Sequence, residues 1–170
     1  MSTLSFPARF NGPPDSANGG IAAGRLAALV DTAGPVQVTL RMPPPLDTEL
    51  RIETVDGTVR AYHDSALVAE ATAVVDEIPL VPAVDYELAV QAASRFEGLS
   101  SHPFPTCVGC GVERSDGMAC HAGPVDPAKP TVVVAEGDGW DGRKAFSRSA
   151  GYGEDGRLLG VTRATWIELR

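Results

Sequence analysis

Alternation of apolar and polar residues dominates the first half of the chain and predicts β-strands. A proline-rich stretch, 42–46, interrupts the alternation, as expected at a bulge or a sheet edge where ladder donors are not needed. Asp56-Gly57 and the triplet 64–66 separate alternating runs, and both are typical of hairpin turns. The strands predicted here are residues 6–10, 36–41, 49–55, 58–63 and 67–75.

Residues 21–30 depart from this pattern, because they are rich in alanine and leucine and are apolar nearly all round. Such a segment predicts a buried α-helix. Asp15, Ser16 and Asn18 are candidate N-caps, and the Gly-Pro pair at 34–35 ends the helix. A strand, a helix and a run of antiparallel strands indicate an α+β fold, with one antiparallel sheet wrapped around one central helix.

The second half repeats part of the first half. Residues 67–73 align with residues 158–164, an offset of 91 positions (158 − 67), and each segment follows a turn and a strand. This match predicts a duplication, but the stretch between Cys120 and Trp140 has room only for a loop and a strand. The later elements predicted are a short helix at 87–96, a strand at 129–135 and a hairpin of 143–152 with 157–169. The expected boundaries are 1–90 for a complete unit, 91–106 for a linker, and 107–170 for an abbreviated second unit that adds strands to the sheet.

Charge and cysteine content exclude several classes of partner. The formal net charge of −8 argues against nucleic acid and anionic membranes, because both attract basic surfaces. No apolar run is long enough to span a membrane, and residues 1–10 lack the charged-then-apolar profile of a signal peptide. Three cysteines are an odd number, which indicates reduced thiols and a cytoplasmic location.

The cysteines and histidines near the middle of the chain are candidate metal ligands. Cys107 and Cys110 have C-x-x-C spacing, and Cys120-His121 follow with a second thiolate and imidazole. Together they have the ligand types of a tetrahedral zinc site, with His102 or His121 as the fourth ligand. The alternative is a pair of buried thiols in a β-turn that holds no metal.

Six segments of the chain, taken in order, resemble one protein family. The segments are residues 10–13, 18–20, 38–47, 67–71, 102–107 with 110–111, and 163–167. Their sequence is similar to that of the acyl-CoA thioesterase-like family of double hot-dog proteins. The resemblance implies a hot-dog fold of two units side by side, a continuous sheet, and an acyl-thioester site where the units meet.

The chain departs from the family in two ways. The relatives are longer and carry, before the last hairpin, a second helix with an acidic residue that is absent here. In single-unit hot-dog thioesterases a His-Gly-Gly opens the helix, and an acid follows about two turns later. This chain has Asn18 in place of the histidine and Ala27 in place of the acid.

Asn18, Gly19 and Gly20 are the candidate residues for holding the thioester carbonyl. Glycines at a helix start bring backbone N–H groups close to a ligand, and the helix dipole favours negative charge there. The alternative is that both glycines only allow close packing of the helix on the sheet. Asp31 and His63 are the candidates for activating water, although a solvated carboxylate at a helix exit and a surface histidine beside a turn are their ordinary roles.

These features lead to three hypotheses about function. The first is an enzyme, an acyl-CoA thioesterase that binds and hydrolyses acyl-CoA or other acyl thioesters and assembles as a homodimer, because an incomplete second unit leaves a sheet edge and apolar surface exposed. The second is a non-catalytic module on the same scaffold that binds acyl ligands or other proteins. The third is a zinc-stabilised partner-binding domain.

Overall fold

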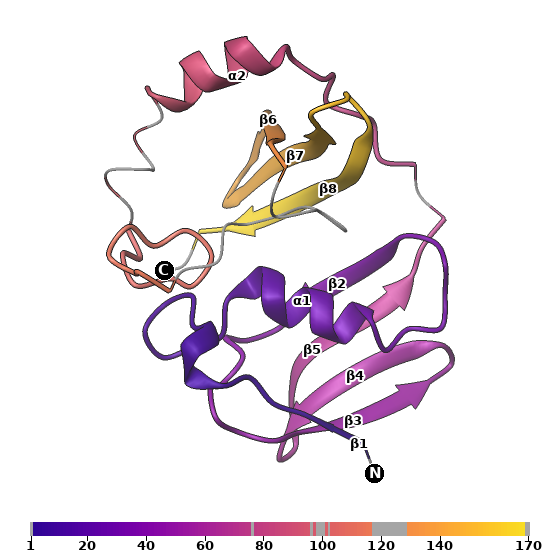
Figure 1. Ribbon diagram of the computed structural model, residues 1–170. Helices are drawn as coiled ribbons and strands as arrows, with labels where there is room; N and C mark the ends of the chain where they lie inside the picture. Colours follow the sequence, from indigo (N-terminus) through magenta and orange to yellow (C-terminus); the bar gives the residue numbers. More distant parts are fainter. Residues whose placement is uncertain are drawn as a thin grey trace. The chain divides into compact units, whose positions relative to one another are not determined.

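The computed structural model describes residues 2–75, 77–95, 97, 101, 103–116 and 129–168 (Figure 1). These residues form two antiparallel sheets and two α-helices, so the predicted α+β class is confirmed. The chain divides into two compact units. The first consists of Met1–Asp76 with Glu97–Ala119, and the second of Glu77–Phe96 with Cys120–Arg170. The segment that carries Cys107 and Cys110 thus belongs to the first unit.

The first unit contains a five-stranded antiparallel sheet. The strand order is β1-β3-β4-β5-β2, so β3, β4 and β5 form a meander and the two earliest strands lie at the edges. Asp56 and Gly57 connect β3 to β4 with φ values of 50° and 74°, the left-handed values that a tight hairpin turn requires. The strands are β1 (Ser2–Leu4), β2 (Val36–Leu40), β3 (Leu50–Val55), β4 (Thr58–His63) and β5 (Ala66–Ala73).

The strand predicted at residues 6–10 is wrong. A 3-10 helix, η1 (Ala8–Phe10), occupies most of this stretch, and the Phe10 amide donates to the Pro7 carbonyl oxygen at 2.8 Å. Proline fixes its own φ near the helical value and has no amide hydrogen for a strand ladder, which explains why a turn forms here.

The predicted helix is present as α1 (Gly19–Ala27) and packs against β2 and β5 (Figure 1). Ala22 and Leu26 lie four residues apart, so they share one face, and both are buried in the core of the first unit. Gly24 and Arg25 are exposed on the other side. The prediction of a helix buried all round is therefore wrong. Alanine and glycine have little apolar area, so a second face made of them does not need burial.

The second unit contains a three-stranded antiparallel sheet of order β6-β7-β8 and the helix α2. A small core forms around Tyr152, whose hydroxyl donates to the Val81 carbonyl oxygen. Strand β6 extends past its predicted end because a bulge between Gly137 and Gly139 allows pairing with β7 to continue. The elements are α2 (Tyr86–Ala93), β6 (Thr131–Asp141), β7 (Lys144–Gly153) and β8 (Leu158–Ile167).

The two segments related by the offset of 91 residues occupy equivalent positions. Residues 67–73 lie in β5 and residues 158–164 lie in β8. Each is the third strand of an antiparallel meander, β3-β4-β5 in one unit and β6-β7-β8 in the other. A duplication requires this equivalence. The sequence had also predicted that the later strands would extend the first sheet, whereas β6, β7 and β8 pair with one another in a separate sheet.

Candidate functional site

A closed loop in front of α1 fixes the position of the helix start. Asn11 and Ala17 form an isolated antiparallel bridge, and the Asn18 amide donates to the Phe10 carbonyl oxygen at 2.8 Å. Gly12 permits this closure, because a Cβ atom at this position would lie 3.0 Å from the Cα of Asn18. The loop therefore delivers Asn18 to the N-cap position of α1.

Asn18 uses both polar atoms of its side chain. Its Oδ1 accepts a hydrogen bond from the Ile21 amide at 3.1 Å, which caps α1. Its Nδ2 donates to Sγ of Cys107 at 3.4 Å. The amide of Asn18 thus joins the helix start to the cysteine segment, which lies 89 residues further along the chain.

Gly19 and Gly20 form an open first turn of α1. Both residues are exposed. A Cβ atom on Gly19 would contact the Leu40 side chain at 3.5 Å, and one on Gly20 would lie 3.3 Å from Oδ1 of Asn18. Neither residue has a side chain to cover the backbone amides of this first turn.

The cysteine segment forms a tight loop, residues 103–116, that we call the cysteine loop. The Cys107 amide donates to the Phe104 carbonyl oxygen at 3.0 Å, and the Gly111 amide donates to the Cys107 carbonyl oxygen at 2.8 Å. Gly111 is required here, because a Cβ atom would lie 2.3 Å from the carbonyl oxygen of Pro105. The sulfur atoms of Cys107 and Cys110 are 3.2 Å apart. Cys107 is only 3% exposed, whereas Cys110 is exposed.

Asn11 and Arg114 attach the cysteine loop to the chain before α1. The buried Asn11 donates through Nδ2 to the Thr106 carbonyl oxygen at 3.2 Å, and its backbone carbonyl oxygen accepts from the Val108 amide at 2.8 Å. Its Oδ1 accepts from Arg114 at 2.7 Å. Arg114 also forms a two-pronged ion pair with Asp116, at 2.6 and 2.8 Å. The sequence predicted neither anchoring role, because the partners of Asn11 and Arg114 lie about 100 residues away along the chain.

The Cys107 thiol is held in an unusual electrostatic environment. Burial raises its pKa, but hydrogen bonds from the side chain of Cys110, from the backbone amides of Gly109 and Cys110, and from Asn18 lower it. The hydrogen bonds outweigh the burial, so the pKa of Cys107 lies below its ordinary value of 9.0. These hydrogen bonds therefore stabilise the thiolate of Cys107 relative to that of an ordinary cysteine.

Asp31 and His63 lie away from the start of α1. Asp31 is exposed beyond the opposite end of the helix, which rises about 10 Å between Gly20 and Ala27. His63 ends β4, two strands from β2 and its Leu40, a lateral distance of about 10 Å. Its Nε2 is 4.0 Å from Oδ2 of Asp64. The structure therefore does not bring either candidate for water activation to the glycine turn.

The predicted metal ligands are described only in part. Cys107 and Cys110 are adjacent, whereas Cys120, His121 and His102 lie outside the described residues. Within the described ranges, no cluster of three or more histidine, cysteine or acidic residues is suited to a metal ion. The two neighbouring sulfurs supply half of a tetrahedral ligand set.

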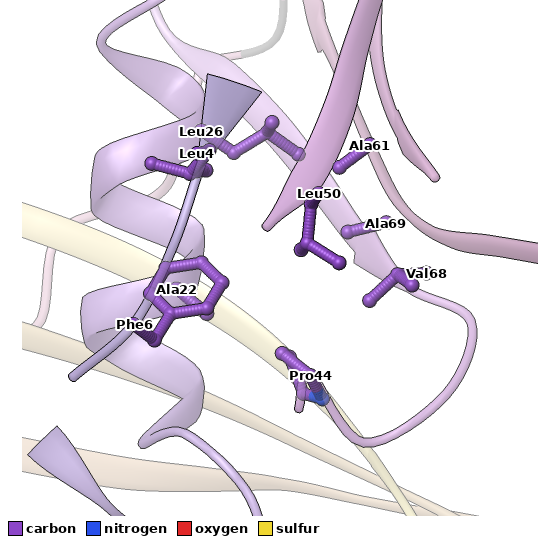
Figure 2. Close-up of a pocket in the computed structure, with 9 residues that line it drawn as sticks. All are labelled: Leu4, Phe6, Ala22, Leu26, Pro44, Leu50, Ala61, Val68 and Ala69. Atoms are coloured by element: carbon purple, nitrogen blue, oxygen red, sulfur yellow. The ribbon is translucent and has the colours of Figure 1, made fainter. Parts of the chain in front are cut away.

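The core beneath α1 leaves no room for an acyl chain. Figure 2 shows Leu26 of α1 and Leu50 and Val68 of the sheet around an apolar cavity of about 10 Å³. Such a volume is close to the minimum for a single water molecule. A bound acyl group would therefore lie outside the core of the first unit.

Comparisons with known proteins add no assignment. No protein-family model, curated protein or solved structure matches the chain. In the described part of the chain, neither α-helix combines the length and the apolar character needed to cross a bilayer.

Proposed function

We propose that the first unit is a hot-dog fold and that the protein binds acyl thioesters at the start of α1. One helix packed on an antiparallel sheet supports the fold assignment, because this is the arrangement that the sequence resemblance implies. The observation that carries the functional proposal is the open Gly19-Gly20 turn, which exposes backbone amides at the positive end of the helix dipole.

These amides suit the chemistry of a thioester carbonyl. When a nucleophile attacks the carbonyl carbon, negative charge develops on the oxygen, and preorganised N–H donors stabilise it. In a serine protease, one such donor contributes roughly 3–4 kcal/mol to transition-state stabilisation. The acyl chain itself would lie against a second copy of the chain, in a cytoplasmic homodimer, because the cavity under α1 is too small to hold it.

A second candidate function is acyl-ligand binding without hydrolysis. The positions of Asp31 and His63 favour it, because neither residue lies beside the glycine turn. The third hypothesis stays an alternative: zinc held by Cys107, Cys110, Cys120 and His121 would stabilise the cysteine loop and would not act on the thioester.

A comparison of two glycine variants tests the proposed site. The purified protein is titrated with acyl-CoAs of short to long chain length, and binding is measured by calorimetry. Gly20→Ala places a methyl group at the first turn, so we expect acyl-CoA affinity to fall at least about tenfold, as for loss of one hydrogen bond to a polarised oxygen. Gly24→Ala adds the same methyl group in open space later in α1 and is expected to bind as the parent does.

Released CoA, measured by chromatography, separates the two candidate functions. Chromatography is preferred to a thiol reagent because the protein has cysteines of its own. Turnover supports a thioesterase, and binding without turnover supports the non-catalytic alternative. Absence of binding to every acyl-CoA, or equal losses in both glycine variants, would contradict the proposed site.

A further inference from the structure

The sulfur atoms of Cys107 and Cys110 are in direct contact. Their Sγ atoms are 3.2 Å apart, and a covalent disulfide needs about 2.0 Å, so an approach of about 1.2 Å completes it. A zinc ion bound by both thiolates would instead hold the sulfurs about 3.8 Å apart, given tetrahedral geometry and a Zn–S distance of about 2.3 Å. The observed spacing lies between these two values, so the two sulfurs are in direct contact but not yet bonded.

The cysteine loop keeps the two sulfurs together without help from helices or strands. The hydrogen bond from Gly111 to the Cys107 carbonyl closes the turn that contains both cysteines. The bond from the Val108 amide to Asn11 fixes the same turn to the first unit. The turn therefore keeps the two sulfurs close together.

The two sulfurs differ in their access to solvent. Cys110 is exposed, whereas Cys107 is 3% exposed and accepts a hydrogen bond from Asn18. A reagent from solution therefore reaches Cys110 first. Cys107 lies directly behind it and is positioned to react with whatever becomes attached to the Cys110 sulfur.

We propose that Cys107 and Cys110 form a reversible dithiol–disulfide pair that exchanges with low-molecular-weight disulfides. The Cys110 thiolate attacks one sulfur of the disulfide RSSR, so a mixed disulfide forms on Cys110 and one RS⁻ leaves. The Cys107 thiolate then attacks Sγ of Cys110, the bond to the attached RS sulfur breaks, and the second RS⁻ leaves. Two electrons pass from the protein to RSSR, and the two thiol protons end on the two RSH products.

This inference is independent of acyl-thioester binding, because it rests on the cysteine loop alone. It assigns Cys110 as the entry sulfur and Cys107 as the resolving sulfur. Oxidation would also replace the sulfur that accepts the Asn18 hydrogen bond by a disulfide sulfur.

Exchange with oxidised glutathione tests the pair. The full-length protein is incubated with oxidised glutathione, and its intact mass and its digested peptides are analysed by mass spectrometry. We expect a loss of two hydrogens and a peptide cross-link between Cys107 and Cys110, both reversed by reduced glutathione. The same product is expected in the Cys120→Ser variant, which removes the remaining cysteine.

Two single variants in the Cys120→Ser background test the assigned order. Cys107→Ser lacks the resolving thiol and is expected to accumulate one glutathione adduct on Cys110. Cys110→Ser leaves only the buried thiol and is expected to form its adduct at least about tenfold more slowly. Circular dichroism checks that both variants are folded.

Three results would overturn the proposal. One is the absence of the Cys107–Cys110 cross-link in the parent protein. Another is faster adduct formation on Cys107 than on Cys110. The third is a purified protein that contains one zinc ion per chain and exchanges only after chelation, which would assign the cysteines to a metal site.

Discussion

Asn18 and Cys107 determine the chemistry at the start of α1 because each has more than one role. Asn18 caps the helix with Oδ1 and donates to Cys107 with Nδ2. Cys107 is buried, yet the hydrogen bonds around it stabilise its negative charge. A substitution at either position therefore changes both the helix start and the cysteine loop.

The lowered pKa of Cys107 predicts a specific dependence of stability on pH. In the unfolded chain this thiol titrates near the ordinary 9.0, and in the folded protein it titrates at lower pH. Between the two values the unfolded state binds more protons, so the free energy of unfolding rises with pH. The contribution is fully present above the unfolded value and is lost as the pH falls through the folded value.

Denaturant unfolding of reduced protein, with a chelator present, measures this effect. From neutral pH toward 9.0, the Cys120→Ser parent is expected to gain stability relative to the Cys107→Ser, Cys120→Ser double variant. Asn18→Asp keeps a capping oxygen but replaces the hydrogen-bond donor to the Cys107 sulfur by a carboxylate. Because the negative charge disfavours the thiolate, the gain in stability with pH should be smaller in this variant. If the free energies of unfolding of the parent and the double variant change in parallel with pH, the pKa of Cys107 is not lowered in the folded protein.

At the scale of the element, the backbone conformation of each glycine decides how its replacement changes the stability of the fold. Gly24 lies inside α1, and Gly57 lies in the turn between β3 and β4 with φ of 74°. A Cβ atom at either position meets nothing within 4 Å. The two sites therefore differ in backbone conformation and not in available space.

Alanine at these two glycines is expected to have opposite effects on stability. Gly24→Ala should raise the free energy of unfolding by about 0.5–1 kcal/mol, because alanine favours the helix and loses less entropy on folding. Gly57→Ala should lower it by about 1–2 kcal/mol, because the left-handed conformation crowds the new Cβ. Thermal or denaturant unfolding measures both changes. A loss of stability in Gly24→Ala would contradict the placement of this glycine on an open helix face.

At the scale of the whole molecule, the second unit exposes large apolar side chains. Trp140 and Trp166 are 76% and 64% exposed. Both pair across the strands with Ala145 of β7, so they share one face of the second sheet. Exposed tryptophans on one face of a sheet, here on either side of an alanine, are typical of a surface that another protein covers.

The proposed homodimer makes a prediction about these tryptophans. Sedimentation velocity over a range of concentrations is expected to show a dimer, because association would bury apolar surface that the described part of the chain leaves exposed. The chain contains two tryptophans, so quenching of their fluorescence by acrylamide reports directly on this face. Quenching should weaken as the dimer forms. A monomer at every concentration would contradict the assembly.

The sequence by itself determined the elements with strong local signals. Alternation predicted β2 to β5, the Asp-Gly pair predicted the turn at residues 56–57, and Asn18 was among the predicted helix caps. These features depend on interactions within a few residues, so local pattern is enough to define them. The α+β class follows from their order along the chain.

Only the tertiary structure decided which distant residues meet. The contact of Asn18 with Cys107 spans 89 residues, and that of Asn11 with Arg114 spans 103. Neither local propensity nor spacing encodes such pairs, because they depend on how the cysteine loop packs against the chain before α1. The strand order separated His63 from the glycine turn, and the packing of the cysteine loop made one thiol of the C-x-x-C pair buried and the other exposed.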